Sequence, residues 1–290
     1  AEVGGSLLSE VGNIFSSGTR SGGFEGLGSF GAFLAVFSIM VGYFAAVVIN
    51  FGDFARFVKN EEEMKKGNLY GLVGNVVFFS FITLMITGGT IALFGEYVAQ
   101  PTDMVAKVDN IFLTIVAAFA FFAATVGINM VANFIPPAYD LANLMPSKIN
   151  FRTGGLITAA FGFVIGGMWV AVITKMGIFP FVNTLGAILA PVFGIMITDY
   201  YIIKKQKIDV NALFNEGKGK YWYNDGFNLK GMVAWILSGY IAIGSVWPNI
   251  LPGGLGNFFA NLGGGGGYAW IIGASLGAVV HLAISSAGKK

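Results

Sequence analysis

Seven apolar stretches constrain this chain more than any other feature of its sequence. A helix needs roughly 20 apolar residues to cross a hydrocarbon core about 30 Å thick, whereas a membrane β-barrel is built from alternating segments of about ten residues. The stretches here are continuous, in a chain with 55% hydrophobic and only 11% charged residues. We therefore expect an all-α integral membrane protein with seven transmembrane helices, at residues 28–50, 69–94, 111–134, 154–174, 178–203, 231–251 and 267–286.

The placement of lysine and arginine predicts an orientation. If the loop after the first stretch is cytoplasmic and the sides alternate, 14 of the 17 basic residues face the cytoplasm. Cytoplasmic loops carry an excess of basic residues in membrane proteins. We therefore expect a multi-pass protein of the cell (inner or plasma) membrane, with the N-terminus of this chain outside and its C-terminus in the cytoplasm. Residues 1–27 would form an extracellular loop, and residues 204–230 a cytoplasmic loop.

Composition and spacing exclude several other classes of protein. The chain has no cysteine, which excludes disulfides, thiol nucleophiles and thiolate metal sites. Its net charge of +2 is too small to suggest a nucleic-acid partner. The sequence offers no Ser–His–Asp set, carboxylate pair or metal-ligand cluster, so we expect no enzyme activity, no metal and no cofactor. The last stretch lacks a lysine for a retinal Schiff base, which disfavours a rhodopsin.

The middle of the first stretch holds Gly42, Tyr43 and Phe44. A glycine at mid-depth can let a helix unwind where it lines a cavity, and a neighbouring aromatic ring offers a stacking face for a flat solute. The alternative is that Gly42 is a helix-packing contact and Phe44 faces lipid. These residues alone favour the alternative.

The third stretch carries two amides, Asn129 and Asn133, followed by Pro136 and Pro137. Residues four apart lie on one face of a helix. An amide presents a donor and an acceptor side by side, which matches the edge of a heterocycle. Hydrogen bonding between helices explains the two amides equally well. We expect the two prolines to break the helix.

Four segments then resemble one family of transporters. They are INFGDFARF (49–57), INMVANFIPPAYDLANLMPSKINFRTGGLITA (128–159), APVFGIMITDYYIIKKQKIDV (190–210) and YWYNDGFNLKGMVAW (221–235). In this order they are similar to signatures of the nucleobase–cation symporter-1 family, whose members transport cytosine and purines, uracil, thiamine or allantoin.

The resemblance implies a LeuT-like fold of two inverted five-helix repeats followed by two further helices. The chain resembles only the second part: residues 28–203 match the second repeat, and residues 231–290 match the two additional helices. The helices of the first repeat would then be partners of this chain, in the same polypeptide or in another. The lipid bilayer is its other expected partner.

The resemblance also implies a substrate site. Phe44 falls where the family places an aromatic that packs against the bound ring, and Asn133 falls where an asparagine binds the substrate. Tyr43, Asn129 and Gly42 are weaker candidates for the same cavity. The expected substrate is a small planar nitrogen heterocycle.

The positions of the family's sodium site differ in this chain. Sodium-coupled members carry two adjacent hydroxyl residues six and five positions before the substrate asparagine, and a small residue one turn earlier. Here these positions hold Gly127, Ile128 and Ala124, so only backbone carbonyls remain. We therefore expect coupling to H⁺ rather than to Na⁺.

Charged residues near the expected cytoplasmic helix ends form a separate group. Asp53, Arg56, Asp140 and Asp199 either make gating ion pairs, with Arg56 bound to Asp140 or Asp199, or anchor the helices at the lipid headgroups. His281, the only histidine, lies within the last stretch, where we expect it to serve packing.

The function implied is that of a secondary active transporter, a symporter that imports a nucleobase or a related heterocycle by alternating access. The alternative is a membrane receptor or sensor that binds such a ligand without transporting it.

Overall fold

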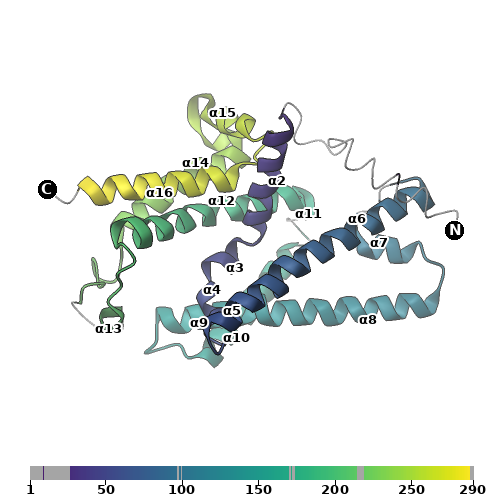
Figure 1. Ribbon diagram of the computed structural model, residues 1–290, viewed down its shortest axis with the longest axis horizontal. Helices are drawn as coiled ribbons and strands as arrows, with labels where there is room; N and C mark the ends of the chain where they lie inside the picture. The colour runs from purple at the N-terminus through teal and green to yellow at the C-terminus, as the bar shows by residue number, and fades with distance from the viewer. Residues whose placement is uncertain are drawn as a thin grey trace. The chain divides into compact units, whose positions relative to one another are not determined.

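The computed structural model describes residue 9 and residues 27–96, 98, 100–169, 171, 174–213 and 219–287 (Figure 1). The described residues form helices and turns, with one isolated bridge between Asn224 and Phe227. The all-α prediction is confirmed. The described chain divides into two compact units: Phe51–Gly162 form the main part of the first, and residues 27–50 together with those from Phe163 onwards form the second.

Six helices of the described residues are long and apolar enough to cross a membrane. They confirm six of the seven expected spans, with bounds Glu61–Phe94, Ile111–Leu144, Phe151–Met168, Pro180–Ile203, Leu229–Val246 and Ala269–Ala287.

The first expected span, residues 28–50, is divided into the helices α2 (Ser29–Tyr43) and α3 (Ala45–Ile49), with a break at Phe44. The short helix α4 (Phe51–Ala55) follows after a second break at Asn50. The local sequence accounts for this division, because glycine costs about 1 kcal/mol in a helix interior and the β-branched residues that follow are weaker helix formers than alanine. Hydrophobicity alone could not predict it, because every residue of the α2–α3 segment is compatible with lipid.

In the first unit, the prediction that Pro136 and Pro137 break the helix is wrong. The chain continues through them, because the π-helical segment η2 (Asn129–Phe134) lies just before α9 (Ile135–Leu144) and both prolines fall at the start of α9. Proline lacks a backbone N–H, and the first turn of a helix is where that loss is best tolerated. A π segment, with its wider turn, joins the two parts into one helix from Ile111 to Leu144.

The first unit also contains the other long helices before residue 163. The α9 helix packs on α10 through glycine, since a Cβ added at Gly154 would lie 2.5 Å from the carbonyl oxygen of Ala138. The remaining elements are α5 (Glu61–Gly67), η1 (Asn68–Gly74), α6 (Asn75–Phe94), α7 (Pro101–Ala106), α8 (Ile111–Ile128) and α10 (Phe151–Met168), the last of which ends in the second unit.

In the second unit, α12, α14 and α16 pack side by side, and α2 lies against α12 and α16 (Figure 1). Small residues let the backbones approach closely, as is usual between helices in membranes. A Cβ added at Gly277 of α16 would lie 2.5 Å from the carbonyl oxygen of Pro191 in α12. The elements are α11 (Thr174–Met176), α12 (Ile178–Ile197), η4 (Thr198–Ile203), α13 (Val210–Leu213), α14 (Leu229–Val246), η5 (Pro248–Ile250), η6 (Pro252–Gly254), α15 (Leu255–Leu262) and α16 (Ala269–Ala287).

Side-chain donors add directional contacts to this packing. The indole N–H of Trp235 donates to the carbonyl of Ile188 at 2.8 Å, and that of Trp247 donates to the hydroxyl of Thr184 at 2.8 Å. The hydroxyl of Tyr268 donates to the carbonyl of Gly31 at 3.0 Å, which ties the start of α16 to α2. The three donors join segments that are distant in the sequence.

We expect Gly194→Ala to lower the free energy of unfolding by about 1–3 kcal/mol, because overpacking costs about that much. A Cβ at Gly194 would overlap the carbonyl of Ala274 in α16. The midpoint of thermal unfolding of the complete protein in detergent measures the change. The control is Gly166→Ala, because a Cβ at Gly166 has no neighbour within 4 Å among the described residues. Equal midpoints for the two variants would contradict the assignment of Gly194 to tight packing.

Candidate functional site

The break in the first span places Phe44 between α2 and α3. Phe44 is half-buried, with φ −90° and ψ 8°, and its ring meets the Tyr43 ring edge-on at a centroid distance of 5.1 Å. Tyr43 is 66% exposed. The helix geometry is interrupted at Phe44, although its N–H still donates to the carbonyl of Met40 at 3.3 Å, and a cavity lined by this segment stays a prediction.

Gly42 lies in a helix-packing contact. It is buried in α2, and a Cβ added at Gly186 of α12 would lie 3.4 Å from the Gly42 Cα. This contact is what the alternative interpretation of Gly42 predicted. A role for Gly42 in solute binding stays a prediction.

The two amides of the third stretch form a short hydrogen-bonded chain in the first unit. The Nδ2 of Asn133 donates to the Oδ1 of Asn129 at 2.7 Å, and the Nδ2 of Asn129 donates to the carbonyl of Thr125 at 2.8 Å. Both asparagines are exposed and lie in η2. The bonds follow one helix face and fix the orientation of both amides.

Phe44 and Asn133 belong to different units, so their joint action on one substrate stays a prediction. The positions expected to replace the family's sodium ligands, Ala124, Gly127 and Ile128, lie in α8 and are exposed.

Arg56 is bound within the first unit. Its Nη2 lies 3.6 Å from the Oδ1 of Asp53, which is buried, and its guanidinium lies 4.6 Å above the ring of Tyr139 in α9. Tyr139 in turn contacts Phe151 of α10 at a centroid distance of 4.7 Å. Asp140, which follows Tyr139 in the sequence, is exposed. Arg56 therefore links the end of the first span to α9, with Asp53 as an ion-pair partner that the sequence interpretation did not name.

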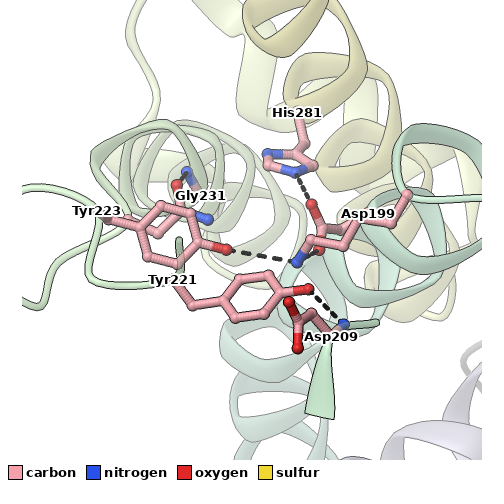
Figure 2. A network of polar contacts seen from close by, with 8 residues as sticks. Asp199, Asp209, Tyr221, Tyr223, Gly231 and His281 are labelled. Carbon is pink, nitrogen blue, oxygen red and sulfur yellow. Dashed lines mark hydrogen bonds and ion pairs between the residues drawn. The ribbon is translucent and has the colours of Figure 1, made fainter. Parts of the chain in front are cut away.

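Asp199 is bound within the second unit. Its Oδ2 pairs with the Nζ of Lys204 at 2.5 Å, and its Oδ1 lies 3.5 Å from the Nε2 of His281. Figure 2 shows the His281 ring and the Asp199 carboxylate directed towards one another. Lys204 also donates to the hydroxyl of Tyr223 at 3.4 Å. Burial alone would lower the pKa of Lys204, but the pairing with Asp199 and Tyr223 outweighs it and raises that pKa above its ordinary value.

Packing alone does not describe His281. The residue is buried at 2% exposure, as expected, but a ring nitrogen faces a carboxylate. Sequence reasoning missed this contact, although one signal was available: Asp199 and His281 lie towards the ends of two stretches that finish on the same side in the expected orientation. Only the packing of α16 on α12 and η4 shows that they meet.

Comparison with known proteins identifies the family. Residues 6–273 match the family described as permease for cytosine/purines, uracil, thiamine, allantoin. An allantoin permease of Bacillus subtilis is 33% identical over 224 residues, covering 77% of this chain and 45% of the relative. A purine-uracil permease of Arabidopsis thaliana is 28% identical over 207 residues, which cover 70% of this chain and 34% of the relative. A hydantoin permease of Microbacterium maritypicum is 26% identical over 255 residues, covering 83% and 48%.

The chain spans about half the length, or less, of these curated relatives. No solved structure gives a significant match. The resemblance carried by the four sequence segments is confirmed, and the family consists of permeases, not enzymes. The chain therefore belongs to the family of permeases for cytosine and purines, uracil, thiamine and allantoin, as a multi-pass membrane protein.

Proposed function

We propose that the chain is the second half of a secondary active transporter that imports a nucleobase or a related planar nitrogen heterocycle by alternating access. The observation that carries the proposal is the family match over residues 6–273, together with 33% identity to an allantoin permease. The named relatives are all permeases, which favours transport over a receptor or sensor.

The proposed architecture is a LeuT-like fold in which residues 28–203 form the second repeat, residues 204–230 a cytoplasmic loop and residues 231–290 two additional helices. The helices of the first repeat would complete the transporter. Exposed apolar surface supports this arrangement, because the most apolar part of Ile111–Leu144 has no buried residue and that of Glu61–Phe94 is 11% buried. Lipid and further helices are the two environments that stabilise such surfaces. The proposed orientation has the N-terminus of this chain outside and the C-terminus in the cytoplasm.

The proposed substrate contacts are a ring and an amide. Phe44 would stack on the heterocycle, with Tyr43 beside it, and Asn133 would bind the edge of the heterocycle. The structure offers a physical reason for the pair of asparagines: Asn129 accepts one N–H of Asn133 and so orients its amide. The Oδ1 and second N–H of Asn133 can then pair with a heterocycle without first reorienting, which lowers the entropy cost of binding.

The proposed gates are the charged groups at the helix ends. Arg56 would hold the first span to α9 through Asp53 and the Tyr139 ring, and Asp140 would lie at the same gate. In the second unit, Asp199 of η4 would form the corresponding ion pair with Lys204. Partly exposed pairs of this kind are weak enough to open and close during a transport cycle.

We expect Asn133→Ala to reduce uptake of radiolabelled allantoin by the complete gene product about tenfold, because that factor corresponds to a lost hydrogen bond of about 1.4 kcal/mol. The matched control is Asn143→Ala, which removes an exposed amide from α9, beyond both prolines. Surface expression of both variants is measured in parallel. Normal uptake by Asn133→Ala would remove this residue from the site, and binding of allantoin without accumulation would favour the sensor.

We further propose that H⁺ rather than Na⁺ drives transport. Gly127 and Ile128 offer no side-chain oxygen where sodium-coupled relatives carry hydroxyls, and Na⁺, as a hard cation, needs several oxygen ligands. Uptake into proteoliposomes should therefore remain unchanged when choline replaces sodium and should collapse when a protonophore removes the proton gradient. Uptake that requires sodium and ignores the proton gradient would contradict this proposal.

A further inference from the structure

The His281 imidazole is a buried polar group with incomplete pairing. Neither ring nitrogen has a hydrogen-bond partner among the described residues, although the ring is almost fully removed from solvent. Buried polar groups are nearly always paired, so an exception at a titratable side chain suggests a second state in which the pairing is made. The transport mechanism proposed above does not use this residue.

The geometry around His281 supplies the missing partner. The Nε2–Oδ1 distance to Asp199 is 3.5 Å, which is too long for a formed hydrogen bond but within reach of a small shift. The second oxygen of the carboxylate is already taken by Lys204 at 2.5 Å. One oxygen of Asp199 therefore pairs with the Nζ of Lys204, and the other faces the Nε2 of His281 (Figure 2).

We propose that His281 is a proton-binding site whose occupancy braces α16 against the π-helical segment η4. Uptake of a proton makes the ring a cation, and its Nε2–H then donates to the Oδ1 of Asp199. The protonated ring adds the attraction between opposite charges to this hydrogen bond, so the neutral ring holds the carboxylate less firmly even in the tautomer that carries Nε2–H. The only covalent change is that a ring nitrogen binds a proton from solvent.

A pocket beside the ring offers a route for the proton. It has a volume of about 340 Å³, and its lining includes Asp199, Lys204, Lys230, His281 and Ser285. The side chain of Asp199 is 24% exposed, while that of His281 is 2% exposed. Solvent protons therefore reach the ring past the carboxylate that stabilises its charged form.

The charged groups near the ring allow His281 to carry a positive charge beside that of Lys204. Among the described residues that line the pocket, Asp199 is the one carboxylate, and Lys204 and Lys230 carry the ammonium groups. Lys204 is neutralised by its ion pair, and Lys230 is exposed, where solvent and salt screen its repulsion. The phenol of Tyr223 also lines the pocket. The sequence of α12 holds no charged residue, the titratable Tyr43 of α2 is 66% exposed, and Tyr240 of α14 donates to Ile250.

The pH dependence follows from the sign of the charge change. The brace is made when the ring carries the proton and is absent when the ring is neutral, so it weakens as the pH rises. Lys204 keeps its charge throughout the neutral range because its pKa is raised. In the proposed orientation the cytoplasmic pH would set the state of α16, whatever the substrate.

A double-mutant cycle tests the brace in the complete purified protein. Thermal unfolding midpoints are measured for the wild type, His281→Gln, Asp199→Asn and the double variant at about pH 6 and about pH 8, on either side of the ordinary range of histidine. We expect a coupling between the two positions of about 2–4 °C at the lower pH and a much smaller one at the higher pH. Ser286→Ala, an exposed substitution on α16, is the control and should shift neither midpoint.

Equal coupling at both pH values would overturn the proposal, because it would show that the contact does not depend on a proton at His281, and no coupling would overturn it as well. If a variant does not fold, the wild-type ring remains observable by ¹⁵N NMR, with the His281 signal assigned from its broadening by a spin label at Ser285→Cys. The ring nitrogens should change from the neutral to the cationic pattern between about pH 8 and about pH 6. A ring that stays neutral throughout this range would overturn the proposal without any folding requirement on the other variants.

Discussion

Backbone hydrogen bonding is the constraint on which the rest of this structure depends. Hydrocarbon offers no partner for an N–H or a carbonyl, so a chain that spans a membrane must be helical unless the protein itself satisfies the exposed groups. Departures from α-helical geometry are therefore informative here. They include Phe44 in the first span, the π-helical segments η1 in the second span and η2 in the third, and η4 after α12.

Two of these departures, η2 and η4, hold polar contacts, and the break at Phe44 holds an aromatic ring. Phe44 lies at a helix break, the Asn129–Asn133 pair lies within η2, and Asp199 lies within η4. Irregular turns widen or interrupt the backbone ladder, and π segments are frequent at functional sites for this reason. Between these points the chain is held by contacts of small residues such as Gly194 and Gly277, which fix the helices without polar groups.

Sequence reasoning reached the membrane class, six spans and the family, because length, hydropathy and motif order are properties of the chain itself. It misjudged Pro136 and Pro137, since a π-helical segment before them is not visible in a hydrophobicity pattern. It also missed the pairing of Asp199 with Lys204 and His281, which depends on which helices pack together. A shared role of Phe44 and Asn133 stays a prediction, because the two residues belong to different units and no local pattern encodes the arrangement of those units.

The π segment in the third span has a consequence for comparing this chain with its relatives. A π turn inserts about one extra residue, and one residue corresponds to a rotation of about 100° around an α-helix. A helical wheel drawn from Ile111 and carried past Phe134 would therefore assign the wrong faces to α9. Against a relative whose corresponding span is α-helical throughout, a one-residue gap at this point would keep the faces of the two helices in register.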